Sequence, residues 1–212
     1  MKYLIITPVA LLILATASFA QSDSRTPVEK PNSQRPQAPS ANAQSAKVQP
    51  VKAPDNALSG FNKFIYGHVK NILLRTAEKM PEENYSFSPA FPLRTFGQVV
   101  GHIADSQYTF CSAALGEKNP APNIQKTKTS KADLIAALKD SLAYCDRAYD
   151  TMTDASASQM VKLFEADMPK VGVLNVNILH SVEHYGNLVI YLRLKNIVPP
   201  TSESGFEPQA KR

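Results

Sequence analysis

The chain has 212 residues, a net charge of +5, two cysteines and four histidines, and 43% of its residues are hydrophobic. A chain of this length and composition can bury one proper core, so we expect one folded domain. No basic stripe alternates with aromatic residues, and we therefore expect no nucleic-acid partner.

The first twenty residues have the pattern of a secretory signal peptide. Lys2 gives a short positive region, the run from Tyr3 to Phe19 is mostly apolar, and small residues precede the expected cleavage after Ala20. No cysteine follows this run, so we expect no lipid anchor and no stable membrane anchor after cleavage. The sequence therefore predicts a periplasmic or secreted protein.

Residues 21–56 are rich in Gln, Ser, Pro, Ala, Asn and Lys. Such a segment buries too little apolar surface to offset its ordering entropy, so we predict a disordered linker. The folded domain is expected at 57–200, followed by a flexible polar tail at 201–212.

Four helices are predicted in the folded part. Apolar side chains recur at helical spacing in four windows, near residues 58–80, 96–115, 131–152 and 171–196. The first window has its predicted core stripe at Phe61, Phe64, Ile65, Val69, Ile72, Leu73 and Ala77. Four helices of about twenty residues in one domain indicate an all-α four-helix bundle.

Capping signals support these boundaries. Asn56 or Ser59 can cap the first helix, Thr95 and Gln98 form a capping box before the second, and Gly116 stands where a C-terminal glycine belongs. The loop at 117–129 is long enough for a crossover. No window alternates with period two, so no sheet is expected, and 153–169 is predicted to hold a short helix or turn.

Cys111 falls late in the second predicted helix and Cys145 in the second half of the third. In an exported protein an even pair suggests a disulfide, which here requires the two helices to run parallel. Two buried free cysteines are the alternative.

Three of the four histidines fall on predicted inner faces. His180 and His184 are four residues apart in an apolar helical run, so both imidazoles lie on one face. His102 lies at the margin of another apolar stripe. Three neutral imidazoles from two facing helices would make a metal site with an open position, whereas hydrogen-bonded core histidines are the structural alternative. His68 is expected at most near the site.

Two stretches resemble the DinB/YfiT-like metalloenzyme family. The run from His180 to Pro200, with His-x3-His, Tyr-Leu-Arg and a closing Pro-Pro, is similar to the family's last helix, and Phe96 to Asp105 is similar to its second. The resemblance implies a four-helix bundle of unusual connectivity and a divalent-metal site with His102, His180 and His184 as ligands.

Family members of known activity use thiols: some transfer bacillithiol or mycothiol, and relatives isomerise maleylpyruvate. This chain departs from them in its predicted export, because thiol cofactors are cytoplasmic. Tyr185 stands where some members carry arginine, which indicates a different subfamily.

We therefore expect a divalent-metal-dependent hydrolase or thiol-type transferase that holds Zn²⁺ or Ni²⁺ and acts on a small molecule. Glu183, Asp105 and Tyr191 are the candidate catalytic groups, as base or orienting residues. The alternative is a non-catalytic exported metal-binding or envelope-stress bundle protein. A homodimer is also possible in this family.

Overall fold

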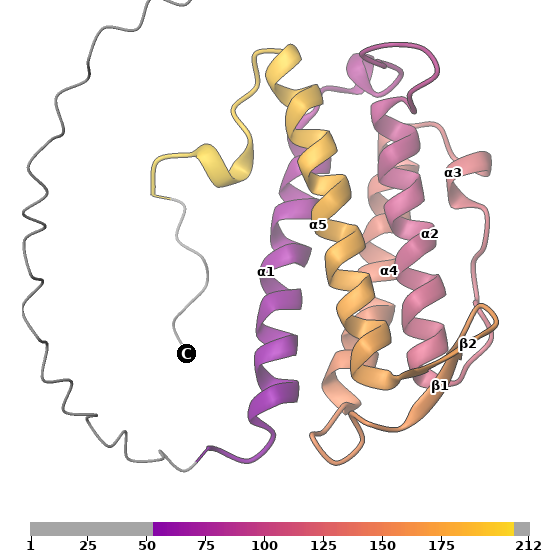
Figure 1. The fold of residues 1–212 in the computed structure, drawn as a ribbon. Coiled ribbons are helices and arrows are strands. Elements are labelled where there is room, and N and C mark those ends of the chain that lie inside the picture. Colours follow the sequence, from indigo (N-terminus) through magenta and orange to yellow (C-terminus); the bar gives the residue numbers. More distant parts are fainter. Residues whose placement is uncertain (1–52, 206–212) are drawn as a thin grey trace, which may run out of the picture. The chain divides into compact units, whose positions relative to one another are not determined.

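The computed structural model describes residues 53–205, so the predicted signal peptide and nearly all of the predicted linker lie outside the described residues. Four long helices pack side by side, as predicted (Figure 1). Their bounds are α1 Ala57–Lys79, α2 Phe96–Leu115, α4 Lys131–Thr151 and α5 Lys170–Leu194. Short helical segments are η1 Glu82–Asn84, α3 Ile124–Thr127 and η2 Pro200–Ser202.

The connectivity differs from a simple up-and-down bundle. Helices α1 and α5 begin at the end of the bundle where α2 and α4 finish (Figure 1). Because α2 and α4 run in the same direction, the segment between them must return along the bundle, and it carries α3 against α2. The predicted crossover at 117–129 is therefore confirmed.

The start and end of α2 follow from the predicted signals. The Thr95 hydroxyl accepts a hydrogen bond from the Gln98 backbone N–H, and the Gln98 side chain accepts one from the Thr95 N–H. Gly116 ends the helix at φ 71°, a left-handed conformation that glycine adopts without steric cost. Local sequence thus fixes both ends of the helix that carries His102.

The predicted cap of α1 was wrong. Asn56 precedes the helix in a left-handed conformation without a capping side-chain bond. The carboxylate of Asp154 instead accepts hydrogen bonds from the backbone N–H groups of Leu58, at 3.2 Å, and Ser59, at 2.7 Å. This cap comes from a loop distant in sequence, so no local pattern could predict it.

The first two turns of α1 are also rotated relative to the predicted stripe. Phe61 and Phe64 are exposed, whereas Tyr66 is buried. Tyr66 stacks on Tyr149 of α4 with ring centroids 3.9 Å apart and donates a hydrogen bond to the Leu142 carbonyl at 2.8 Å. Burying this tyrosine with a partner for its hydroxyl sets the rotation of the helix.

A two-stranded antiparallel sheet contradicts the prediction of no sheet. Strands β1 Met160–Leu163 and β2 Ala166–Pro169 form a hairpin between α4 and α5, with Met160 opposite Pro169. Leu163 is the strands' one buried residue. Each strand has only four residues, so the alternation of Val161 and Leu163 with Lys162 is too short to predict a strand from the sequence.

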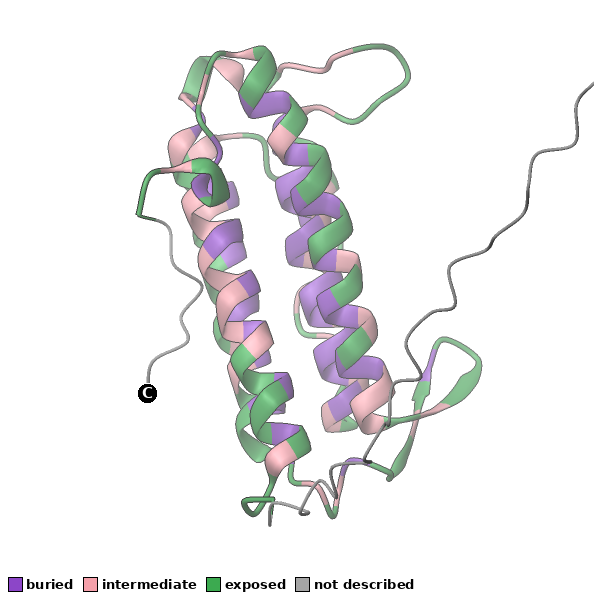
Figure 2. Cartoon of the chain, turned by 60° about the vertical axis from the view of Figure 1, so that its left-hand side comes forward, coloured by how far each residue is buried: buried purple, intermediate pink, exposed green. Residues whose placement is uncertain are grey.

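The core lies along the inner faces of the four long helices, and exposed residues cover their outer faces (Figure 2). A disulfide joins Cys111 of α2 to Cys145 of α4, with the two Cα atoms 5.3 Å apart. The parallel course of these helices makes the bond possible, so the predicted pairing is confirmed.

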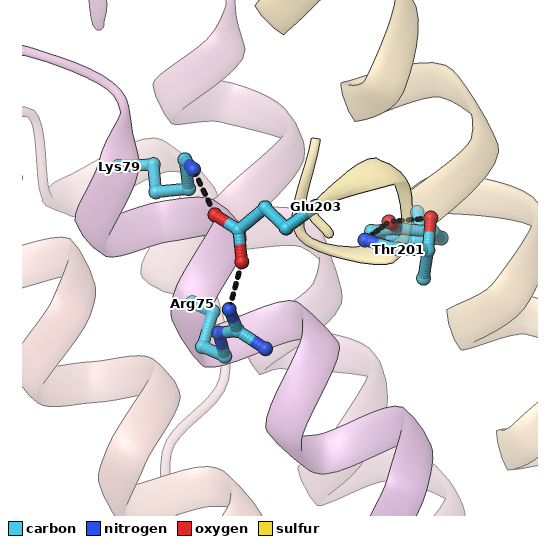
Figure 3. A network of polar contacts seen from close by, with 5 residues as sticks. Arg75, Lys79, Thr201 and Glu203 are labelled. Atoms are coloured by element: carbon cyan, nitrogen blue, oxygen red, sulfur yellow. Dashed lines mark hydrogen bonds and ion pairs between the residues drawn. The ribbon is translucent and has the colours of Figure 1, made fainter. Parts of the chain in front are cut away.

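The chain beyond α5 packs back on the bundle. The Glu203 carboxylate forms ion pairs with Arg75 and Lys79 of α1, and the Thr201 hydroxyl bonds to the hydroxyl of Tyr185 (Figure 3). The described part of the predicted tail, residues 201–205, is therefore docked rather than frayed. None of the described helices combines the length and hydropathy that a membrane span requires.

Candidate metal centre

Three histidines from two helices meet between α2 and α5. Their candidate ligand nitrogens all lie within 4.8 Å of one another, and the Nε2 atoms of His180 and His184 are 3.2 Å apart. The ring centroid of His102 lies 5.1 Å from that of His180 and 4.8 Å from that of His184. The structure thus brings together all three predicted ligands, and we call them the metal centre.

Simple helix geometry accounts for this meeting. His180 and His184 are one turn apart on α5, so their side chains project from the same face. His102 lies in the second turn of α2, which packs against α5. The ring of Phe110, two turns further along α2, covers the edge of His180 with centroids 5.4 Å apart.

The histidines are held in the neutral form that metal binding requires. Burial is the main cause, and together with the charges of His184, His102 and Arg94 it lowers the pKa of His180 to about 4. Burial also lowers the pKa of His102 and His184, and the positive charge of Arg94 acts in the same direction on both. At neutral pH the centre therefore presents three uncharged imidazoles.

The donor set fits a divalent first-row ion. In a tetrahedral zinc site with Zn–N bonds of about 2.0–2.1 Å, two ligand nitrogens are about 3.3 Å apart. The His180–His184 separation of 3.2 Å matches this value. The other ring nitrogen of His180, Nδ1, is buried without a hydrogen-bond partner, so no protein group outside the three histidines competes for the lone pairs of this ring. The three histidines could therefore hold a metal ion.

Asp105 positions the segment next to His102. Its two carboxylate oxygens accept hydrogen bonds from the backbone N–H groups of Ile124, at 2.7 Å, and Gln125, at 2.9 Å. Gly101 permits this approach, because a Cβ there would lie 2.8 Å from the Cα of Gln125. The Gln125 side chain then forms a hydrogen bond with His102. Asp105 thus acts on the histidine through α3.

Asn187 contacts His184 at the ring nitrogen that does not face His180. Its amide lies 3.4 Å from Nδ1 of His184, one turn along the same helix. When a histidine binds a metal through Nε2, its Nδ1 carries the proton and donates. The amide oxygen of Asn187 is then the matching acceptor, because amide oxygen and nitrogen are assigned from the hydrogen-bond network.

The other two predicted catalytic residues lie beside the centre. The Tyr191 hydroxyl donates a hydrogen bond to the backbone carbonyl of Arg94 at 2.6 Å. Glu183 is exposed, and its charge raises the pKa of His102 and His184, against the larger effect of burial. A catalytic role for Glu183, Asp105 or Tyr191 stays a prediction.

A cavity of about 210 Å³ adjoins the centre. His184 and Arg94 are both among the residues that line it, together with Pro89, Leu93, Val99, Asn187, Ile190 and Tyr191. Sequence reasoning missed Arg94 and Gln125, which lie in an irregular segment and in the crossover. Neither position carries a motif, and only the folded chain brings them to the histidines.

Two other polar residues of the bundle are not part of the centre. His68 of α1 is not part of the three-histidine group. Asn177 is fully buried and belongs to a separate set of polar side chains, which we call the core network. Its Nδ2 atom donates to Oε1 of Gln107 at 3.0 Å and to the Tyr149 hydroxyl at 3.2 Å, and Gln107 donates to Ser181 at 2.8 Å.

The fold and the histidines together define a helical bundle with a three-histidine cluster, and comparison with known proteins places it. A model of the DinB superfamily matches residues 67–188, more than half of the chain. The chain therefore belongs to the DinB superfamily, as the sequence resemblance implied.

Individual relatives agree with this assignment. The chain is 26% identical over 127 residues to the uncharacterised protein YjoA of Bacillus subtilis strain 168, a match covering 58% of this chain and 82% of YjoA. A crystal structure of a DinB-like protein from Bacillus cereus ATCC 10987 superposes with a TM-score of 0.58 at 18% identity, covering 64% of this chain and 91% of that one. The YjoA crystal structure superposes with a TM-score of 0.51 at 24% identity, and the match covers 62% of this chain and 91% of the YjoA chain. These two structures support the fold.

Proposed function

We propose that the protein is a divalent-metal-dependent enzyme, a hydrolase or thiol-type transferase, with His102, His180 and His184 as metal ligands. The observation that carries the proposal is the convergence of three neutral imidazoles from α2 and α5 beside a cavity. Three protein ligands leave a coordination position for a substrate or water, which is typical of catalytic rather than structural zinc sites.

The ion would supply a Lewis acid that polarises a substrate and makes a bound water or thiol more acidic. Zn²⁺ and Ni²⁺ are the ions we favour, since imidazole ligands suit both. The chain's own residues orient the ligands: Gln125 bonds to His102, and Asn187 lies against His184. Glu183, exposed beside His184, is the candidate proton acceptor at the mouth of the site.

Chelation and reconstitution test this proposal. We expect protein reloaded with zinc or nickel to turn over a member of an ester, amide or thiol-transfer substrate panel, and activity to follow metal occupancy. His184→Ala should abolish both the metal and the activity, whereas His68→Ala, on α1, serves as the matched control and should change neither.

An open coordination position distinguishes the enzyme from a non-catalytic metal-binding protein. In cobalt-loaded protein we expect azide to change the visible absorption spectrum, because a small anion can enter an open position. A cobalt spectrum that azide leaves unchanged would favour the non-catalytic alternative. We also propose that the mature protein acts in the periplasm or outside the cell, on the basis of the pattern in residues 1–20.

A further inference from the structure

The cavity beside the metal centre contains an arginine without a counter-ion. Within residues 53–205, Arg94 takes part in no ion pair, whereas Arg75 pairs with Glu203 and Arg147 with Glu117. The Arg94 side chain is exposed and lines the same cavity as His184. A guanidinium left unpaired beside a binding cavity is available for an oxyanion, whose two oxygens match its planar fork.

The backbone of Arg94 is fixed, so its position relative to the histidines is defined. Its carbonyl oxygen accepts the hydrogen bond from Tyr191 of α5, the helix that carries His180 and His184. The next residue, Thr95, is the capped start of α2, the helix that carries His102. The backbone of Arg94 is thus tied to both helices of the metal centre, which fixes where its side chain begins relative to the three histidines.

The charge around the centre favours an anion. Three neutral imidazoles add no charge of their own. A divalent ion and Arg94 would therefore give this region a positive balance against two carboxylates, that of Asp105, which binds backbone N–H groups of α3, and that of the exposed Glu183.

The remaining walls of the cavity restrict the size and character of the ligand. Pro89, Leu93, Val99 and Ile190 are apolar and can contact a short carbon skeleton. At about 30 Å³ for each water in the liquid, a volume of about 210 Å³ holds about seven water-sized groups. A small metabolite fits this space, whereas a polymer segment does not.

We propose that the metal centre acts on a small organic anion, whose carboxylate or phosphate group binds Arg94 while a second donor atom of the same molecule reaches the ion. This inference rests on the proposed function, because it needs an ion held by the three histidines. Arg94 is then a specificity-determining residue: it selects the substrate class and places the reacting end near the metal centre.

Anion titration of the cobalt-loaded full-length chain tests the inference without an activity assay. Azide occupies the open metal position alone, whereas malonate and phosphonoacetate can bridge from the ion to Arg94. We expect Arg94→Gln to weaken malonate and phosphonoacetate about tenfold or more, and azide by no more than about threefold. Arg94→Lys should recover part of the affinity, since it keeps the charge and loses the fork.

Arg193→Gln is the matched control, because it removes the same charge from α5 at a residue that bonds to Ser202 and does not line the cavity. It should change none of the three affinities. A larger loss of phosphonoacetate than of malonate affinity in Arg94→Gln would indicate that Arg94 binds the phosphonate group. An equal loss of the two would indicate that it binds the carboxylate that both molecules carry.

Two results would overturn the inference while leaving the proposed function intact: an equal loss of azide and malonate affinity in Arg94→Gln, or no loss of either. Failure of the parent protein to bind cobalt would instead contradict the proposed function, and the inference with it. Circular dichroism of each variant establishes that a lost affinity does not reflect a lost fold.

Discussion

Two groups of polar side chains lie between the same two helices, and they differ in how their hydrogen bonds are satisfied. In the core network, Gln107 of α2 and Asn177 and Ser181 of α5 bond to one another and to Tyr149, and Asn177 Oδ1 is the network's one buried side-chain atom without a partner. Within a turn or two of it, the metal centre has three imidazoles whose ring nitrogens converge. The Nε2 atoms of His180 and His184 are 3.2 Å apart, and His184 also lines a cavity.

The contacts around each group distinguish a structural polar cluster from a ligand-binding one. Buried polar groups that satisfy each other specify how helices pack, and their loss costs stability. Imidazoles that converge beside a cavity can instead direct their nitrogen lone pairs at a metal ion, which gives them a role besides packing. We therefore expect variants of the core network to lose stability and keep their metal affinity. Variants of the metal centre should lose metal affinity and keep their stability.

The largest effect on stability is expected from the disulfide beside the core network. Asn177 Nδ2 lies 3.8 Å from both sulfur atoms. For a sequence separation of 34, the chain-entropy model gives about 4 kcal/mol of stabilisation. Cys111→Ala/Cys145→Ala should lower the free energy of unfolding in urea by this amount and retain one metal ion per chain. Loss of the ion from the folded double variant would show that the two regions are coupled.

Gln107→Leu should have the next largest effect. It removes the partner of Asn177 and of Ser181 in a fully buried site, and an unsatisfied buried polar group costs about 1–3 kcal/mol. We expect that loss in urea unfolding and a metal dissociation constant within about threefold of the parent. Thr109→Val is a matched α2 control, because this half-buried hydroxyl bonds to the Asp105 carbonyl within its own helix.

Gln125→Ala should weaken metal binding and leave stability unchanged, the reverse of Gln107→Leu. Removing a hydrogen-bonding group behind a metal ligand weakens metal affinity about 10- to 100-fold. Gln125 is on the short α3, whose backbone Asp105 still holds, so the free energy of unfolding of the metal-free protein should stay unchanged. Competition titration with a chromogenic chelator measures the affinity, and Lys126→Ala is the neighbouring control. Equal metal affinity in both variants would contradict a role for Gln125 in orienting His102.

The pH dependence of stability gives a further test. Because the folded-state pKa of His180 lies below the ordinary 6.5, at about 4, the unfolded chain binds more protons between these values. Stability of the metal-free protein should therefore fall as the pH drops from about 6.5 to 4, and His180→Ala should reduce this fall. At pH 7 all three imidazoles are already neutral, so calorimetry in buffers of different ionisation enthalpy should detect almost no proton release from them on metal binding.

Much of this molecule could be predicted from local sequence. Helical periodicity and the Thr95–Gln98 capping box located α2, and the spacing of His180 and His184 placed both on one face. Periodicity also placed His102 at the margin of an inner face, and the resemblance to DinB/YfiT proteins implied all three histidines as ligands. The structure brings the three together. These features depend on residues a few positions apart, or on a motif that family members share.

The parts that escaped prediction depend on contacts between distant segments. Asp154 caps α1 from a loop about 95 residues away. The strands of the hairpin at 160–169 have four residues each, too few for their apolar alternation to predict a strand. Arg94 and Gln125 reach the metal centre only because α3 packs on α2 and Tyr191 holds the segment before α2. Such residues have no local pattern that indicates their role.

Metal content measured by mass spectrometry tests the separation of the two regions most directly. Three samples are compared after identical reconstitution with zinc: the parent, the His180→Ala/His184→Ala variant and the Gln107→Leu variant. We predict about one ion per chain in the parent and in Gln107→Leu, and none in the histidine variant. A parent that holds no ion, or a histidine variant that keeps it, would contradict the assignment of the three histidines as a metal centre.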